Sequence, residues 1–355
     1  MEGNANGPTG AFFCHLLKAK FSFQELCKSR GGSPASQWER RSNQWVKRGT
    51  TATPSPHAPH SEKESAMASE EMSCYEGASV QSFQFYLDHS GEHEAMLKCL
   101  RDLLPAEFKR ISADKQGLDV LGLGSGGGEM DVQILGLLKA ACPDLPITVD
   151  VVEGSSKLTE GFKALVAKSP DIQGVPFTWH IMHSDSYINQ VKAKVDAKKF
   201  DFIHSIQMIY YVDALTETIK FYHGLLKKKG TFMIIVEAHD SGWDRLWSTY
   251  SRVLCDEVIK EYRSSKQVIA SLNSLGLKFE EHAIPNCFDV TECADPGSTK
   301  GRRLLNFLTA RDDFHQSFTP EIRAEILDFL KNKCSTEKDG RVVFDATLSC
   351  LLVRA

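Results

Sequence analysis

No arrangement of cysteine or histidine in this sequence predicts a metal site or a set of disulfides. The 10 cysteines are scattered along 355 residues, without a C-x-x-C pair and without the His/Cys spacing of a zinc site. Reduced thiols are the simplest interpretation, and they are typical of cytoplasmic proteins. We therefore expect a cytoplasmic protein without a bound metal.

Long apolar runs and a concentrated positive charge are also missing. The aliphatic stretch FMIIV at 232–236 is only a few residues long, whereas a membrane-spanning helix needs about 20 apolar residues. Charged residues make up 25% of the chain, with a net charge of −4 and both signs interspersed. This balance argues against a nucleic-acid partner, because phosphate binding calls for a basic face. We expect neither a membrane nor a nucleic acid as partner.

The first 66 residues differ in composition from the rest. They are polar and rich in Ser, Pro and Arg from Arg30 onward, and they show no sustained helical or strand period. We expect a disordered extension over 1–66, followed by one domain over 67–355. A mitochondrial presequence is the rival interpretation, but Glu2, Glu25 and Glu39 argue against it.

From about residue 80 the pattern alternates between short β-branched runs and amphipathic stretches, which predicts an α/β fold. The last two strand-like runs are 277–284 and 342–353, and a helix starting at Thr319-Pro320 precedes the second of them. The expected strands are 118–123, 147–153, 177–182, 200–206, 231–237, 277–284 and 342–353. This order predicts a Rossmann-like, seven-stranded, mostly parallel sheet with helices on both faces and an antiparallel last strand.

Helix ends are marked in the same part of the sequence. The stretch 213–230 reads as a helix that ends in lysines and Gly230, and 264–276 reads as a helix from Ser264 to Gly276.

A glycine-rich turn follows the first expected strand. The sequence DVLGLGSGGGEMD at 119–131 runs from a strand into Gly124, Gly126 and Gly128 before a helix near Glu129. Such a turn lets the backbone approach a ligand closely. Glu129 occupies the position of the third glycine of the nicotinamide fingerprint, so the spacing favours a methyltransferase over a dehydrogenase. A tight strand-to-helix connection without a ligand is the alternative.

Glu153 ends the second expected strand, beside the glycine turn, where a carboxylate can accept hydrogen bonds from both ribose hydroxyls of a nucleoside. Ser184 follows the third strand and Ile206 ends the fourth, where both could border an adenine ring. Together these residues predict a nucleoside cofactor.

The motifs of metalloproteases, serine hydrolases and P-loop proteins are missing from the sequence. Methyl transfer needs none of them, because the site has only to position an unprotonated nucleophile and exclude water. An imidazole with a pKa near 6.5 is largely neutral at physiological pH and needs no strong base.

Several motifs together resemble histamine N-methyltransferase. They are SGEHE at 90–94, GLGSGGGEMDVQIL at 122–135, VVEGS at 151–155, DFIHSIQMIYYV at 201–212 and SGWDRLW at 241–247. The resemblance covers roughly Met67 to Ala355 and implies a class I methyltransferase that uses S-adenosylmethionine. It implies a cofactor half at about 110–237 and substrate-binding elements within 75–104, 238–262 and 286–340.

The resemblance also assigns site residues. The cofactor positions map to Gly124, Gly126, Gly128, Glu153, Leu158, Ser184 and Ile206. Glu92 maps to the carboxylate that binds the substrate amine, and Gln207 to the group that orients the reacting ring. The aromatic walls map to Phe83, Tyr210, Tyr211, Trp243, Trp247 and Phe307. Without the resemblance, Glu92 would read as an acid favoured at a helix start, and the two tryptophans as core.

Departures from the histamine enzymes point to a larger substrate. The asparagine of their last strand is Ala346 here, a wall tyrosine is Ser79, and a cofactor-contacting glutamine is Leu158. Glu237 and Lys260 replace a valine and a cysteine, which adds one charge of each sign. Carnosine, β-alanyl-histidine, has an ammonium and a carboxylate, whereas histamine has no carboxylate.

The sequence is therefore similar to the carnosine-methylating branch of the family, with Glu92 and Glu237 for the ammonium and Lys260 for the carboxylate. A histamine enzyme is the alternative, and a binding module without catalysis is another. We expect a monomer that acts on a small imidazole amine or dipeptide.

Overall fold

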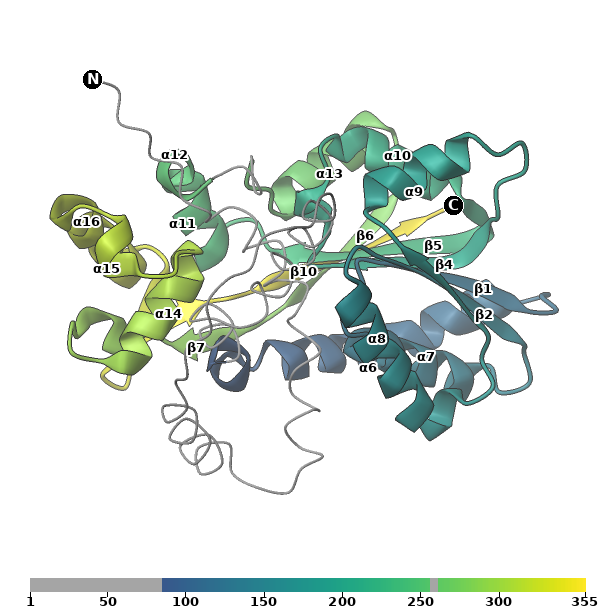
Figure 1. Cartoon of the computed structure of the whole chain (residues 1–355), viewed down its shortest axis with the longest axis horizontal. Helices are drawn as coiled ribbons and strands as arrows, with labels where there is room; N and C mark the ends of the chain where they lie inside the picture. Colours follow the sequence, from purple (N-terminus) through teal and green to yellow (C-terminus); the bar gives the residue numbers. More distant parts are fainter. Residues whose placement is uncertain (1–84, 256–260) are drawn as a thin grey trace, which may run out of the picture.

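A seven-stranded sheet forms the centre of residues 85–255 and 261–355, the part of the chain that the computed structural model describes (Figure 1). The expected extension at 1–66 lies outside the described residues. The strand order is β3-β2-β1-β4-β5-β10-β6. The strands are β1 (Leu118–Leu123), β2 (Ile147–Glu153), β3 (Phe177–Ile181), β4 (Phe200–Ile206), β5 (Leu226–Glu237), β6 (Phe279–Ile284) and β10 (Leu348–Arg354).

The pairing of the strands confirms the predicted class I methyltransferase fold. β1 lies between β2 and β4 and is parallel to both, so the strand order reverses at β1. β10 is antiparallel to β5 and to β6, as expected for the last strand. In such sheets ligands bind beyond the carboxyl ends of the strands at the point of reversal.

Helices cover both faces of this sheet (Figure 1). On one face the buried core includes side chains of α6 (Glu92–Ser112), α7 (Glu129–Ala141) and α8 (Ser156–Lys168). On the other face it includes side chains of α9 (Ser184–Lys192), α10 (Leu215–Gly224) and α13 (Ser265–Ser274). α13 begins after a capping box at Ser264, the residue at which the sequence predicts a helix start. No helix in the described ranges is both long and apolar enough to cross a membrane.

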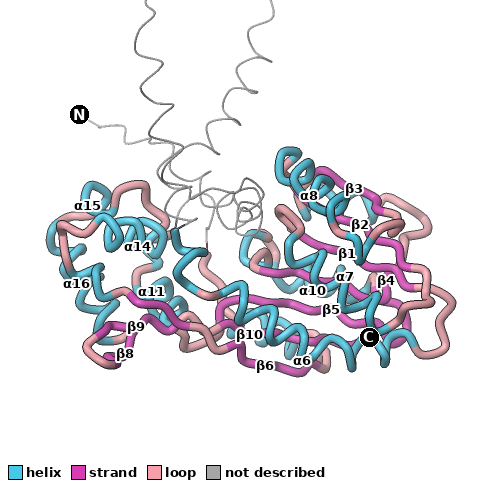
Figure 2. Tube along the Cα trace, turned by 90° about the horizontal axis from the view of Figure 1, so that it is seen from below, coloured by secondary structure: helices cyan, strands magenta, loops and turns pink. Residues whose placement is uncertain are grey.

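A second, three-stranded sheet lies beside one end of the first (Figure 2). It has the order β7-β9-β8, with β7 (Cys287–Asp289), β8 (Ser335–Lys338) and β9 (Arg341–Asp345). Near it lie α11 (Gly242–Thr249), α12 (Ser251–Leu254), α14 (Thr299–Thr309), α15 (Phe314–Ser317) and α16 (Pro320–Asn332). α16 begins at Pro320 with Thr319 as N-cap, which confirms the helix start read from the sequence.

The prediction of one strand over 342–353 is wrong. The chain leaves β9 at Asp345, whose carboxylate accepts hydrogen bonds from the Thr347 backbone N–H (3.1 Å) and hydroxyl (2.6 Å). This local turn passes the chain from the small sheet to β10 of the large one.

The predicted helix over 213–230 is also too long. α10 ends at Gly224, and the lysine run belongs to the start of β5. Lys227 Nζ pairs with Asp119 Oδ2 at 2.5 Å and with Asp201 Oδ2 at 2.9 Å. These carboxylates lie on β1 and β4, so partners distant in sequence draw the lysines into the sheet.

Glu107 on α6 connects this helix to the sheet and should make stability depend on pH. Burial would raise the pKa of this carboxyl group, but hydrogen bonds from Arg110 and Thr231 outweigh burial and lower the pKa to about 2. A lowered pKa stabilises the fold above the unfolded-state value of about 4.3, and this contribution is lost as the pH falls toward 2. We expect Glu107→Gln to lower the free energy of unfolding by about 2–3 kcal/mol at pH 7.

Urea unfolding between pH 3 and pH 7 measures this contribution, with Glu160→Gln on the exposed side of α8 as control. The difference between wild type and Glu107→Gln should shrink below pH 4. A difference that stays constant to pH 3 would contradict the role given to this carboxylate.

Candidate active site

The glycine turn between β1 and α7 depends on backbone conformations that other residues rarely adopt. The φ angles of Gly124, Gly126 and Gly128 are 61°, 58° and 82°. A Cβ atom on Gly124 would lie 2.5 Å from Cγ of Met208, and one on Gly128 would lie 2.0 Å from the Phe162 ring. Two of these glycines are therefore required by space as well as by conformation.

The carboxylate of Glu153 holds this turn against the end of β2. Its Oε2 accepts a hydrogen bond from the Gly126 N–H at 2.9 Å, and its Oε1 accepts one from the Ser155 N–H at 2.8 Å. The residue is 1% exposed. Each carboxylate oxygen has a second lone pair, so the group can accept further hydrogen bonds from a ligand.

A pocket opens beside the turn, at the carboxyl ends of β1 to β4. Its lining residues are Gly124, Val152, Gly154, Met182, His183, Ser184, Asp185, Met208, Tyr211 and Val212. The predicted residues Gly124, Ser184 and Tyr211 therefore border one hollow, although they come from three separate segments. Backbone at Gly124 and Gly154 and apolar side chains at Val152 and Met208 make it suitable for a nucleoside.

Two of the predicted cofactor residues, Leu158 and Ile206, do not line this pocket. Leu158 and Ile206 are 4% and 8% exposed. The Leu158 N–H donates to Ser155 Oγ at 3.2 Å at the start of α8. Ser184 Oγ lies 2.8 Å from the Tyr222 hydroxyl, so its orientation is fixed from the protein side. His183, Asp185 and Met208 were not singled out from the sequence, although they directly follow β3 and β4.

Glu92 lies at the start of α6, as predicted, but it is fully buried. Its Oε2 accepts a hydrogen bond of 2.5 Å from the Tyr86 hydroxyl, and its backbone N–H donates to Ser90 Oγ at 3.3 Å. The Tyr86 ring stacks on Phe307 with the ring centroids 4.1 Å apart. The carboxylate is thus surrounded by aromatic side chains rather than by solvent.

A second carboxylate belongs to the same cluster. Glu237 ends β5 and is 6% exposed. Burial, followed by the charges of Glu237 and Glu92 among nearby groups, raises the pKa of Tyr210 well above its usual value. Burial and the same two carboxylates raise the pKa of Tyr86. Glu92 and Glu237 therefore act on the same two tyrosines, and the cluster carries two acidic groups.

Gln207 follows β4 in a conformation that glutamine rarely adopts, with a φ of 50°. Its backbone N–H donates to the Ile235 carbonyl at 2.8 Å, and its Oε1 accepts a hydrogen bond from the Tyr210 hydroxyl at 3.4 Å. Nε2 is buried and has no hydrogen-bond partner among the described residues. Backbone strain next to an unsatisfied amide is typical of a ligand-binding position.

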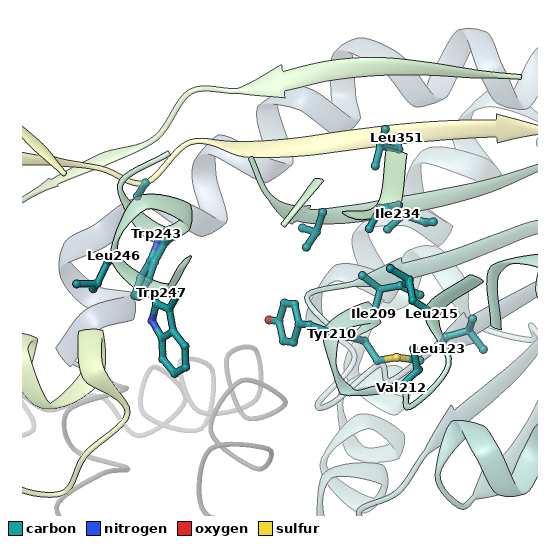
Figure 3. Packing of buried hydrophobic residues seen from close by; sticks show 14 of the residues in the cluster. Leu123, Ile209, Tyr210, Val212, Leu215, Ile234, Trp243, Leu246, Trp247 and Leu351 are labelled. Carbon is teal, nitrogen blue, oxygen red and sulfur yellow. The ribbon is translucent and has the colours of Figure 1, made fainter. Parts of the chain in front are cut away.

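Aromatic side chains border the two acidic groups. In Figure 3 the indoles of Trp243 and Trp247 on α11 face Tyr210 across the site. Trp247 Nε1 donates to the Leu308 carbonyl at 3.1 Å, which fixes its ring. The rings of Tyr210 and Tyr211 are 4.8 Å apart, and Tyr211 lines the glycine-turn pocket. These adjacent tyrosines therefore connect the aromatic cluster to that pocket.

Ala346 is buried at the end of β9, in the turn to β10. Three residues of the predicted substrate site, Ser79, Phe83 and Lys260, lie outside the described residues. Tyr86, Tyr262 and Phe288 belong to the aromatic cluster and were not predicted. These three residues come from distant segments of the chain. Only contacts in the folded chain point to them: Tyr86 donates to Glu92, Tyr262 stacks on Trp247, and Phe288 lies edge-on to Tyr86.

Comparison with known proteins shows the family of the chain. Residues 94–282 match the family described as "Methyltransferase domain". The chain is 38% identical to histamine N-methyltransferase A of Xenopus laevis over 78% of its length and 94% of that protein. It is 37% identical to carnosine N-methyltransferase 2 of Gallus gallus, over 78% of this chain and 86% of that protein. The histamine N-methyltransferase of Cavia porcellus is 35% identical over 79% of this chain and 96% of that protein.

Proposed function

Since this chain belongs to the S-adenosylmethionine-dependent methyltransferases that include histamine N-methyltransferase and carnosine N-methyltransferase 2, we propose that it methylates the imidazole ring of carnosine to give anserine. Histamine is the second candidate substrate, because histamine enzymes match the chain at similar identity. The two substrates share the imidazole ring and an ammonium group, and they differ in the peptide bond and the carboxylate.

The pocket beside the glycine turn suits S-adenosylmethionine. Glu153 would accept hydrogen bonds from the two ribose hydroxyls, because its carboxylate is already oriented by Gly126 and Ser155. Gly124 brings backbone to the pocket where a side chain has no room. Ser184, Ile206 and Leu158 are the proposed surroundings of the adenine, and Gly128 lets α7 start beside Phe162. When bound, the cofactor supplies a methyl group carried on a positively charged sulfur.

One observation supports an imidazole amine as the substrate class: two buried carboxylates, Glu92 and Glu237, act on the same tyrosines within an aromatic-walled cluster. A primary ammonium has three N–H donors and is best buried against acidic acceptors. Glu92 and Glu237 would hold the ammonium of the β-alanyl group. Ala346, with its small side chain, leaves room for the longer frame, and Lys260 is the proposed partner of the carboxylate.

The reacting nitrogen needs orientation more than activation. A neutral imidazole has one lone pair on a ring nitrogen at physiological pH. The other ring nitrogen then carries the proton, and Gln207 would accept a hydrogen bond from it through Oε1, so it would fix which nitrogen faces the cofactor pocket. Trp243, Trp247, Tyr210 and Tyr211 would exclude water and attract the positive charge that the ring acquires, and Phe83 would complete the walls.

The choice between substrates is tested by turnover of the purified full chain on carnosine and on histamine. We expect kcat/KM for carnosine to exceed that for histamine by at least about tenfold, because buried polar groups that meet no partner penalise the smaller substrate. Comparable values, or activity on histamine alone, would reject the assignment to carnosine.

We also propose that the enzyme acts in the cytoplasm and as a monomer. Six of the described cysteines, at positions 99, 142, 287, 293, 334 and 350, form no disulfide, which agrees with a reducing cytoplasm. A monomer is the proposed form of the enzyme. Size-exclusion chromatography with light scattering measures the mass, and a stable dimer would contradict this part.

A further inference from the structure

Asn286 lies between β6 and β7, next to the turn where the chain passes from the small sheet to β10. Its carbonyl oxygen accepts a hydrogen bond of 2.9 Å from the Ala346 N–H. In the β7–β9 pair, Cys287 lies opposite Asp345 and Phe288 opposite Phe344. The bond to Ala346 continues this antiparallel pairing by one residue, so Asn286 lies opposite Ala346.

The pairing determines the direction of the Asn286 side chain. Residues directly opposite each other in an antiparallel pair share one face, and faces alternate along each strand. Asn286 therefore shares a face with Phe288 and Phe344. The Phe288 ring lies 5.3 Å from the Tyr86 ring, and the Phe344 ring lies 5.3 Å from Trp243. This face borders the aromatic cluster around Glu92 and Glu237.

The amide of Asn286 also comes close to the start of α6. Its Oδ1 lies 3.8 Å from the position that a Cβ of Gly91 would occupy, and Glu92 is the next residue. Opposite Asn286, Ala346 offers only a methyl group, which can neither accept nor donate a hydrogen bond. The amide therefore lies between the acidic cluster and the small side chain of Ala346.

The amide nitrogen of Asn286 is buried and has no hydrogen-bond partner among the described residues. A buried donor without an acceptor costs stability, and a ligand that brings an acceptor would remove this cost. Carnosine has two kinds of oxygen acceptor, the peptide carbonyl and the carboxylate. Histamine has neither.

We propose that Asn286 is a specificity-determining residue that donates a hydrogen bond from Nδ2 to an oxygen of the dipeptide. This inference rests on the proposed function and extends it, because it names the group that recognises the part of carnosine that histamine lacks. Its contribution is to substrate binding, whereas Gln207 orients the ring.

The test compares Asn286→Ala and Asn286→Asp with wild type, in the full chain, on three substrates. The third substrate is β-alanylhistamine, which keeps the peptide carbonyl and lacks the carboxylate. We expect KM for carnosine to rise about tenfold or more in both variants, with kcat changed little and KM for histamine unchanged. A rise for β-alanylhistamine as well assigns the hydrogen bond to the carbonyl; a rise for carnosine alone assigns it to the carboxylate.

Asn332→Ala is the matched control, because Asn332 is exposed on α16 and donates only to Asp328 Oδ1, at 2.8 Å. Calorimetry with S-adenosylhomocysteine reports on folding and cofactor binding independently of turnover, and its Kd should stay at the wild-type value. An unchanged KM for carnosine, or an equal rise for carnosine and histamine, would overturn the inference. Absence of carnosine turnover in wild type would overturn the proposed function and this inference together.

Discussion

Replacing Glu153 by glutamine is expected to weaken binding of S-adenosylhomocysteine by roughly a hundredfold. The amide keeps the size of the side chain but loses the negative charge and one acceptor. Hydrogen bonds from ligand hydroxyls to a carboxylate are about twice as strong as those between neutral groups, so two weakened bonds account for an effect of this size. Calorimetric titration of the purified variant measures the Kd directly.

Glu160→Gln is a suitable control, since Glu160 is exposed on α8, one residue after the buried Thr159. It should bind like wild type. Glu153 also holds the Gly126 and Ser155 N–H groups, so the thermal unfolding of each variant must be compared without ligand. A Glu153→Gln protein that unfolds normally and binds S-adenosylhomocysteine with wild-type affinity would remove Glu153 from the cofactor site.

Replacing Glu92 by glutamine is expected to lower kcat/KM for carnosine several hundredfold. The variant can still accept the hydrogen bond from Tyr86, so the fold around α6 should persist. The substrate ammonium, however, loses a fully buried ionic partner, and removing one partner of such a pair costs about 3–5 kcal/mol. Steady-state kinetics on carnosine, with cofactor binding measured separately, detects this loss.

The same helix supplies the control. Glu94 lies two residues further along α6, is exposed, and pairs with Arg101 at 3.7 Å on the surface. Glu94→Gln should leave kcat/KM within about twofold of wild type, because an exposed ion pair contributes little. Equal effects of the two substitutions would show that charge near α6, and not a specific contact of Glu92, determines the rate.

The cofactor half was the easier part to predict from the sequence, because its signals are local. A buried strand followed directly by glycines at 124, 126 and 128 predicts a turn and the start of α7, and both lie where expected. Glu153 could be identified because it ends the next strand, which is parallel to β1. Parallel neighbours bring their carboxyl ends to one edge, so adjacency in the sheet follows from the order of the strands.

The errors arose where distant partners override local preference. The lysine run after Gly224 looks like a basic helix end, but Asp119 and Asp201 on neighbouring strands draw Lys227 into β5. The stretch 342–353 looks like one strand, but Asp345 turns it from one sheet to another. The sequence contains Lys227 and its two aspartates, and Asp345 and Thr347, but it does not indicate that these residues contact each other in the fold.

The substrate half was harder for the same reason. Only the resemblance makes Glu92 and Gln207 candidates for the substrate site, because an acid at a helix start or an amide after a strand is unremarkable by itself. Tyr86, which donates to Glu92, and Asn286, which pairs with Ala346, were missed altogether. Tyr86 is notable for its burial and its bond to Glu92, and Asn286 for a buried amide nitrogen without a partner among the described residues; only the folded chain reveals these features.

In the proposed reaction, this chain places an imidazole nitrogen of carnosine against the methyl group of S-adenosylmethionine. Incubating the full chain with carnosine and cofactor labelled with carbon-13 in that methyl group, followed by NMR of the product, tests it directly. We expect a labelled methyl on a ring nitrogen of the histidyl residue. A label on the amine of the β-alanyl group, or no transfer to carnosine, would contradict it.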